Sequence, residues 1–169
     1  MFGVSVTLSA KTLQDSSLIS QIETALQEYS AQPGKLWFEI SEAMALQNLG
    51  LTREIAEKIK DLGCSIILDD FGLGPASLHY LEQLSIDMIK IHPGVIRGLA
   101  GDMKKQNYLK NLVEMLHGFR LTVAAKSVED PQLLDILREL GFDYAQGFAI
   151  GKPLESIEFN AETTNSVTT

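Results

Sequence analysis

The chain has 169 residues, 45% of them hydrophobic, which is enough for one domain with a substantial buried core. Its 14 basic and 22 acidic residues give a formal charge of −8, and this acidic balance argues against non-specific binding to nucleic acids or membranes, which depends on basic surfaces. Because the sequence shows no signal peptide and no run of about 18 apolar residues, we expect a cytoplasmic protein, or the cytoplasmic part of a larger one.

Short apolar runs alternate with longer amphipathic segments from the N-terminus onward. The short runs predict six strands, at residues 4–8, 36–40, 65–69, 87–91, 121–125 and 144–150. Apolar residues at helical spacing predict helices at residues 17–29, 52–62, 77–84, 105–119 and 131–140. Within this pattern, Thr52 is the expected cap of its helix and Gly63 the expected end. The alternation indicates parallel strands covered by helices, and therefore an α/β fold.

The cysteine and histidine residues carry no clear chemical pattern. Cys64 is the only cysteine, so an intrachain disulfide is excluded, and the burial habits of free cysteine predict a core residue rather than a nucleophile. His79, His92 and His117 are not spaced as a metal-binding set. We expect His92 to shape a loop with Pro93, and His117 to lie partly exposed on a helix.

The informative polar residues lie at the carboxyl ends of the predicted strands. In an α/β barrel these ends meet at one rim, where ligands and catalytic groups gather. Carboxylates that converge there repel one another unless a cation lies among them, and a divalent ion with oxygen ligands is a common solution. The residues at these ends are Glu39, Glu42, Asp69, Asp70, Lys90, Lys126 and Gln146.

Several of these residues also have simpler interpretations. Glu42 fits the N-terminus of a helix, where the helix dipole favours a carboxylate. The Asp69-Asp70 pair fits turn chemistry, with one aspartate capping a helix. The segment Gly72-Leu73-Gly74 fits a flexible turn better than a phosphate cradle, and Lys90 fits the outer surface of the barrel. Their shared position, one strand after another, favours a common site.

Five segments of the sequence resemble the EAL domain family, in the same order and at the same spacing, between residues 4 and 153. The family has Glu-Ile-Thr-Glu, Leu-Asp-Asp-Phe-Gly-Thr-Gly, Asp-x-x-Lys-Ile, Ala-Glu-Gly-Val-Glu, and a closing Gln-Gly-aromatic with Lys-Pro. The matching segments here are Glu39-Ile40-Ser41-Glu42, Leu68-Asp69-Asp70-Phe71-Gly72-Leu73-Gly74, Asp87-Met88-Ile89-Lys90-Ile91, Ala125-Lys126-Ser127-Val128-Glu129, and Gln146-Gly147-Phe148 with Lys152-Pro153.

The resemblance implies a TIM-barrel-like EAL fold and a link to cyclic di-GMP, which the family hydrolyses with two Mg²⁺ or Mn²⁺ ions. It implies metal-ligand positions at Glu39, Asp69 and Asp70. It also places Lys90, Glu129 and Gln146 at inherited catalytic positions on the rim. It implies that Glu42 anchors the loop after Asp70.

Three departures from the family pattern would disable the site. Thr7 replaces a metal-ligating Asn, His92 replaces an Asp, and Lys126 replaces the first Glu of Glu-Gly-Val-Glu. The Lys126 substitution changes the local charge by two units and removes a ligand. At about 4 Å, two like charges cost roughly 4 kcal/mol at an effective dielectric near 20. We therefore expect a degenerate site without bound metal, in which the ammonium pairs with Asp69, Asp70 or Glu39; Mg²⁺ or Mn²⁺ would be required if any activity remained.

The barrel is expected to be incomplete, because about six strands are visible and the family's first strand–helix segment is not present. The outer strands would then have unpaired edges. The barrel could stay open, a second copy could cover the edge, or another chain could supply the missing part; we favour self-association or a signalling partner, although the chain could also be a piece of a longer protein. We assign residues 1–160 to the EAL-like domain and 161–169 to a disordered tail.

Three functions remain open for such a domain. The first is a catalytically inactive signalling module that senses cyclic di-GMP or contacts other proteins. The second is a residual metal-dependent phosphodiesterase that forms pGpG, possibly complemented by another chain. The third is an interaction scaffold that binds no nucleotide.

Overall fold

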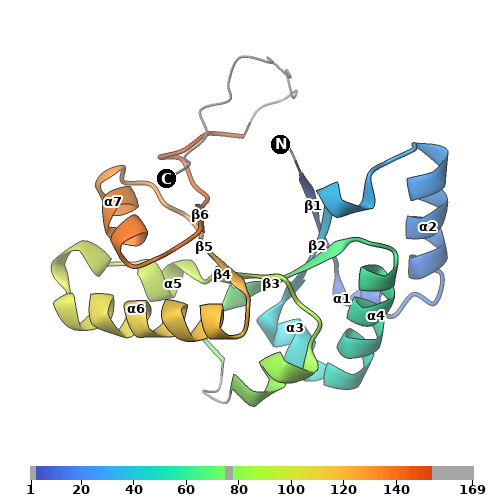
Figure 1. Ribbon diagram of the computed structural model, residues 1–169, viewed down its shortest axis with the longest axis horizontal. Coiled ribbons are helices and arrows are strands. Elements are labelled where there is room, and N and C mark those ends of the chain that lie inside the picture. Colours follow the sequence, from blue (N-terminus) through green and yellow to red (C-terminus); the bar gives the residue numbers. More distant parts are fainter. Residues whose placement is uncertain (1–2, 75–77, 154–169) are drawn as a thin grey trace.

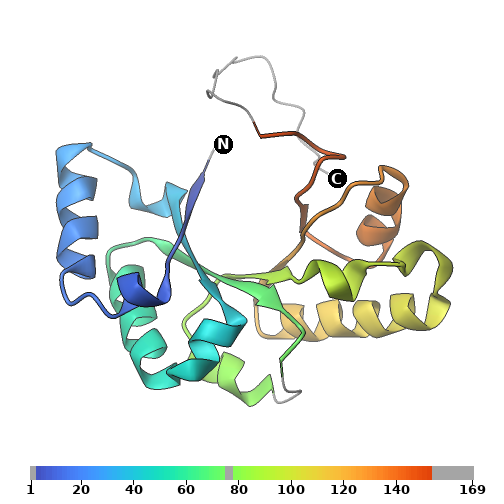
Figure 2. The ribbon, with the colours of Figure 1, turned by 180° about the vertical axis from the view of Figure 1, so that it is seen from behind.

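The computed structural model describes residues 3–74 and 78–153. Six parallel strands form one sheet in the order β1-β2-β3-β4-β5-β6, so that each strand pairs with its neighbour in the sequence. The sheet curves into a half-barrel with its helices on the convex side (Figures 1 and 2). The α/β class and the incomplete barrel expected from the sequence are confirmed.

The bounds of the elements are as follows. The strands are β1 Val4–Thr7, β2 Leu36–Ser41, β3 Ser65–Phe71, β4 Met88–Ile91, β5 Thr122–Ala125 and β6 Tyr144–Ala145. The α-helices are α1 Ala10–Leu13, α2 Leu18–Glu28, α3 Glu42–Gln47, α4 Leu49–Asp61, α5 Pro93–Ile96, α6 Met103–Gly118 and α7 Gln132–Glu139. Short 3-10 helices lie at η1 Pro33–Lys35, η2 Leu78–Gln83 and η3 Leu99–Gly101.

Two predicted boundaries differ from the structure by three residues or more. Thr52 does not cap its helix, because α4 begins at Leu49 and the Asn48 side chain accepts the hydrogen bond from Leu51 N–H; Thr52 is buried inside the helix. The last strand ends at Ala145 rather than at residue 150, because the chain turns back at the positive-φ residue Gly147. The predicted tail, residues 161–169, lies outside the described residues.

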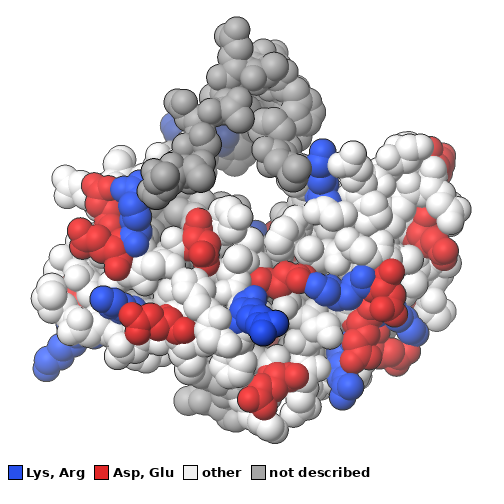
Figure 3. Space-filling view, in the orientation of Figure 1, with Lys and Arg blue, Asp and Glu red and all other residues white. Residues whose placement is uncertain are grey.

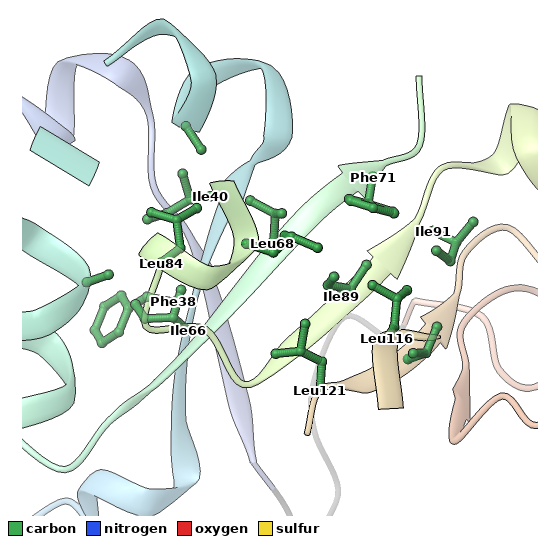
Figure 4. Close-up of a cluster of buried hydrophobic side chains, with 14 of the residues drawn as sticks. Phe38, Ile40, Ile66, Leu68, Phe71, Leu84, Ile89, Ile91, Leu116 and Leu121 are labelled. Atoms are coloured by element: carbon green, nitrogen blue, oxygen red, sulfur yellow. The ribbon is translucent and has the colours of Figure 1, made fainter. Parts of the chain in front are cut away.

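The core lies between the convex face of the sheet and the helices. Ile66, Leu68, Ile89 and Ile91 alternate along β3 and β4 and are at most 1% exposed (Figure 4). Burying each such side chain contributes roughly 1.5–3 kcal/mol. Cys64 is also buried in this core, as predicted.

The concave face carries a second, smaller apolar cluster. Ile67, Met88 and Ala124 are buried there, and Trp37 packs against them. Both faces of the inner strands are therefore apolar near the middle of the sheet, as is usual for parallel sheets. This arrangement leaves the carboxyl ends of the strands for polar side chains.

The sheet ends at β1 and β6 within the described residues. Val4 and Val6 on β1 are 58% and 41% exposed, and Tyr144 on β6 is 58% exposed.

On the face drawn in Figure 3, acidic and basic side chains are interspersed, and no single basic patch dominates it. None of the helices within residues 3–74 and 78–153 is long and apolar enough to cross a membrane.

Candidate functional site

The structure brings the predicted polar residues together at the carboxyl ends of β2 to β5. Glu39 lies in β2, Asp69 and Asp70 end β3, Lys90 lies in β4, and Lys126 directly follows β5. Two ion-paired groups link these four strands; one joins two carboxylates to a lysine and the other joins one.

The first group is formed by Lys126 with both aspartates. Its Nζ atom lies 2.8 Å from a carboxylate oxygen of Asp69 and 2.8 Å from Oδ1 of Asp70. Adjacent residues of a regular strand point to opposite faces. Asp70 departs from this alternation because its φ is +57° and the pairing of β3 with β4 shifts between Leu68 and Phe71. The irregular backbone therefore lets one ammonium contact both carboxylates.

The electrostatics of this group keep Lys126 charged. Burial alone would lower the pKa of the ammonium, but hydrogen bonds and attraction from Asp69 and Asp70 outweigh it and raise the pKa above the usual lysine value. The Lys126 and Asp69 side chains are 21% and 14% exposed, whereas Asp70 is 45% exposed. The cation is thus a permanent part of the site at neutral pH.

The second group is the ion pair between Glu39 and Lys90. The Lys90 Nζ donates to Oε1 of Glu39 at 2.6 Å, and the two side chains are only 12% and 8% exposed. This pair spans β2 and β4 across the concave face of β3. It shows that Lys90 does not lie on the outer surface of the barrel, the simpler alternative considered from the sequence.

Glu42 lies at the first position of α3 and is buried with three hydrogen-bond donors around it. Gly72 N–H and Gly74 N–H donate to Oε2 at 3.1 and 3.3 Å, and the Tyr80 hydroxyl donates to Oε1. Burial, followed by the neighbouring Glu42 carboxylate, raises the pKa of Tyr80 well above its usual range. Ser41 caps the same helix by accepting from Met44 N–H.

Tyr80 was not identified from the sequence. The only signal was an aromatic residue in the predicted short helix that follows the Phe71-Gly72 turn. Since the turn and this helix are separated along the chain, no spacing rule places the phenol against Glu42. The structure shows that Glu42 joins α3, the loop after β3 and η2.

Three other predicted residues lie around these two groups. Thr7 on β1 pairs in register with Glu39. Gln146 is tied by its backbone, because its N–H donates to Ala125 and its carbonyl accepts from Val128 N–H. Glu129 and Gln146 are both exposed.

The histidines have structural contacts. His92 caps α5, with Nδ1 accepting from Gly94 N–H at 2.9 Å, which agrees with the predicted loop-shaping part. His117 lies on α6, partly exposed, 2.9 Å from Asp143. His79 pairs with Glu82 at 3.3 Å on the surface.

Two cavities border the first ion-paired group. One of about 370 Å³ is lined by Lys126, Glu129 and Arg97 together with apolar residues of α5 and α7. The other, of about 560 Å³, is lined by Asp70, Glu42 and His92. Because Lys126 borders the first cavity and Asp70 the second, their ion pair lies at the boundary of both.

The fit of this site to divalent ions can be judged from its donors. Within residues 3–74 and 78–153, no three His, Cys, Asp or Glu side chains gather in an arrangement that could hold a metal ion. Asp69 and Asp70 share one ammonium, and Glu39 contacts another. These three carboxylates therefore face lysine nitrogens at hydrogen-bond distance, and the group does not fit a pair of divalent cations.

The fold and these motifs define a half-barrel of the EAL type, and comparison with known proteins agrees. The EAL domain family matches residues 1–153, and the chain belongs to this family.

Among curated relatives, the cyclic di-GMP phosphodiesterase PdeB of Shewanella oneidensis is 33% identical over 150 residues, which are 89% of this chain and 18% of PdeB. The bifunctional diguanylate cyclase/cyclic di-GMP phosphodiesterase MucR of Pseudomonas aeruginosa is 31% identical, over 90% of this chain and 22% of MucR. The chain thus spans only about a fifth of these relatives.

Solved structures show the same fold. The MucR phosphodiesterase of Pseudomonas aeruginosa in complex with c-di-GMP superposes with a TM-score of 0.82 at 31% identity, covering 90% of this chain and 62% of that one. The FimX EAL domain from Pseudomonas aeruginosa bound to c-di-GMP superposes with a TM-score of 0.88 at 27% identity, covering 94% of this chain and 65% of that one. The family assignment made from the motifs is confirmed.

Proposed function

We propose that this chain is a cytoplasmic cyclic di-GMP signalling module that does not hydrolyse the nucleotide by a two-metal mechanism. It acts by binding the nucleotide or by contacting other proteins. The observation that carries this proposal is the position of Lys126, whose ammonium lies 2.8 Å from both Asp69 and Asp70.

Charge explains why Lys126 opposes metal binding. Two divalent cations bring four positive charges, which need several carboxylates in direct contact. Here Lys126 adds a positive charge between the aspartates, and Lys90 adds another beside Glu39. A metal ion would have to displace both ammoniums from partly buried carboxylates. No Mg²⁺ or Mn²⁺ requirement is therefore expected for the function of this chain.

The binding function is supported by what remains at the rim. Two relatives, MucR and the FimX EAL domain, have solved structures in which c-di-GMP is bound. In this chain the rim has two cavities and a loop held by Glu42, and Lys126 and Arg97 line the first cavity. Lysine suits the two phosphates of a cyclic dinucleotide as a point charge.

Protein contacts are supported by the exposed edge of the sheet. The β1 strand, Val4–Thr7, carries no charged residue and no proline, the usual protections of an exposed edge. Its valines are exposed on the side that the helices cover elsewhere. We propose that a second copy or another signalling protein covers this edge.

A second candidate function is residual phosphodiesterase activity, possibly complemented by another chain. Two observations favour it: Glu39, Asp69 and Asp70 are all present at the rim, and relatives such as PdeB are named phosphodiesterases. In that case Mg²⁺ or Mn²⁺ would be needed, and at least Lys126 would have to move.

Calorimetric titration with cyclic di-GMP, with and without Mg²⁺ or Mn²⁺, separates these functions. We expect micromolar binding that is independent of metal, and no pGpG when the mixture is analysed by chromatography. Metal-dependent pGpG formation would support the second candidate and overturn the first. Absence of binding under all conditions would leave an interaction scaffold, which sedimentation analysis of self-association would then test.

A further inference from the structure

Asp87 and Asp143 make the same contacts at two places in the sheet. Each directly precedes a strand, β4 and β6 respectively. Asp87 exchanges hydrogen bonds with Ile66, the second residue of β3: its N–H donates to the carbonyl at 2.9 Å, and its Oδ2 accepts from the N–H at 2.9 Å. Asp143 does the same with Val123, the second residue of β5, at 2.9 and 2.7 Å.

Each aspartate also contacts a basic residue, and the two basic residues occupy the same position in their respective helices. Lys60 is the next-to-last residue of α4, and its Nζ donates to Oδ1 of Asp87. His117 is the next-to-last residue of α6, and its Nε2 lies 2.9 Å from Oδ2 of Asp143. Both basic residues lie six positions before the strand residue that their aspartate contacts. The last turn of a helix is also where a cation is favoured by the helix dipole.

We name these sets the inner clamp (Asp87, Lys60 and Ile66 N–H) and the edge clamp (Asp143, His117 and Val123 N–H). The inner clamp holds β4, which has a neighbouring strand on each side. The edge clamp holds β6, which has only two residues and, within the described chain, pairs with β5 alone.

The segment after β6 reaches the rim and is fixed there by its backbone. Gln146 N–H donates to the Ala125 carbonyl at 2.8 Å, and Val128 N–H donates to the Gln146 carbonyl at 3.0 Å. Ala149 N–H then donates to the Val128 carbonyl at 2.9 Å. The short β6 segment is therefore fixed at one end by Asp143 and at the other by Val128.

We propose that Asp143 and His117 are positioning residues for the Gln146–Gly147 segment of the rim. The edge clamp acts from the opposite end of the strands and keeps β6 in register with β5. When it is broken, residues 144–149 detach from β5 while the inner strands stay folded, because so few ladder bonds hold the edge. Local opening of this kind follows from uneven stability across a fold.

Hydrogen exchange measured by mass spectrometry tests this proposal on the full chain. In His117→Ala, exchange at residues 144–149 should rise about tenfold, in line with the loss of a hydrogen bond to a charged group, while residues 65–71 exchange as before. His117→Lys copies the inner clamp and should restore the protection. Lys60→Ala is the matched control and should produce no selective change at residues 144–149.

Two results would overturn the edge clamp. One is unchanged exchange at residues 144–149 in His117→Ala. The other is an equal rise throughout the sheet, which would mean that the pair contributes only to global stability. If His117→Ala does not yield folded protein, Asp143→Asn removes the charge with little change of shape, and the same two results apply to it.

Discussion

The Lys126 ammonium contacts Asp70 at 2.8 Å because the Asp70 backbone is left-handed, with φ at +57°. A strand continued regularly would direct the Asp70 side chain away from the side chain of Asp69. The left-handed conformation costs a residue other than glycine about 1–2 kcal/mol. Here one ammonium contacts both carboxylates, and this attraction offsets part of the cost.

Removing the Lys126 charge should destabilise the fold and create a response to metal. We expect Lys126→Met to lower the free energy of unfolding by about 1 kcal/mol, a modest value because the Asp70 side chain is 45% exposed. The two carboxylates would then repel each other, so millimolar Mn²⁺ should raise the Tm of the variant more than that of the unmodified chain.

Urea denaturation and thermal melts measure these two effects. Lys104→Met, at an exposed lysine of α6, removes the same charge elsewhere and is the matched control. An equal response of the unmodified chain and Lys126→Met to Mn²⁺ would contradict the view that this ammonium excludes a cation.

Loss of the Tyr80 hydroxyl should weaken the loop after β3. Tyr80→Phe removes one of the three donors to the buried Glu42 carboxylate, and hydrogen bonds to charged groups contribute about 1.5–3 kcal/mol. We expect a decrease of this size in the free energy of unfolding by urea. Tyr108→Phe, at a 58% exposed tyrosine, should change it by less than about 0.5 kcal/mol. Similar values for the two variants would rule out the anchoring of Glu42 by Tyr80.

A side chain at position 147 should not be tolerated. An added Cβ on Gly147 would lie 2.3 Å from both the nitrogen and the oxygen of Val128, which are backbone atoms and cannot rotate away. We expect Gly147→Ala to cost more than about 3 kcal/mol, or to prevent folding. In Gly151→Ala the new Cβ meets no atom within 4 Å, so this variant should melt like the unmodified chain. Circular dichroism melts of both proteins give the comparison, and a stable Gly147→Ala would mean that the segment is not packed against Val128.

The fold should lose stability at alkaline pH, because two of its residues have raised pKa values. The pKa values of Lys126 and Tyr80 are both raised, so the folded state holds these protons more tightly than the unfolded chain. Unfolding then releases protons above about pH 10, so the free energy of unfolding falls as pH rises through this range. Below about pH 10 the stabilisation from these two groups is complete. Urea titrations between about pH 8 and 11 should show this decline, and Tyr80→Phe should make it shallower. A decline of the same slope in Tyr80→Phe would show that the Tyr80 hydroxyl does not contribute to the pH dependence.

The sequence predicts the sheet and the members of the site but not the geometry that joins them. Alternating apolar runs indicate all six strands, because parallel strands need continuous apolar segments. The EAL motifs place Glu39, Asp69 and Lys126 at one rim. The left-handed backbone at Asp70 and the contact of Tyr80 with Glu42 depend on tertiary packing, for which the sequence carries no periodic signal. The early end of β6 likewise follows from the close approach of Gly147 to Val128.

Ser127 offers a final test, because it is left-handed where the family's motif has glycine. Its φ is +54°, and it lies next to Lys126 in the segment that follows β5. Glycine adopts this conformation freely but loses more backbone entropy on folding, so the two effects partly cancel. We expect Ser127→Gly to raise the free energy of unfolding by about 0.5–1 kcal/mol, whereas Ser20→Gly, within α2, should lower it by about 0.5 kcal/mol. Parallel urea titrations measure both changes. If Ser127→Gly were destabilising, the serine side chain would have to contribute more to the rim than its strained backbone costs.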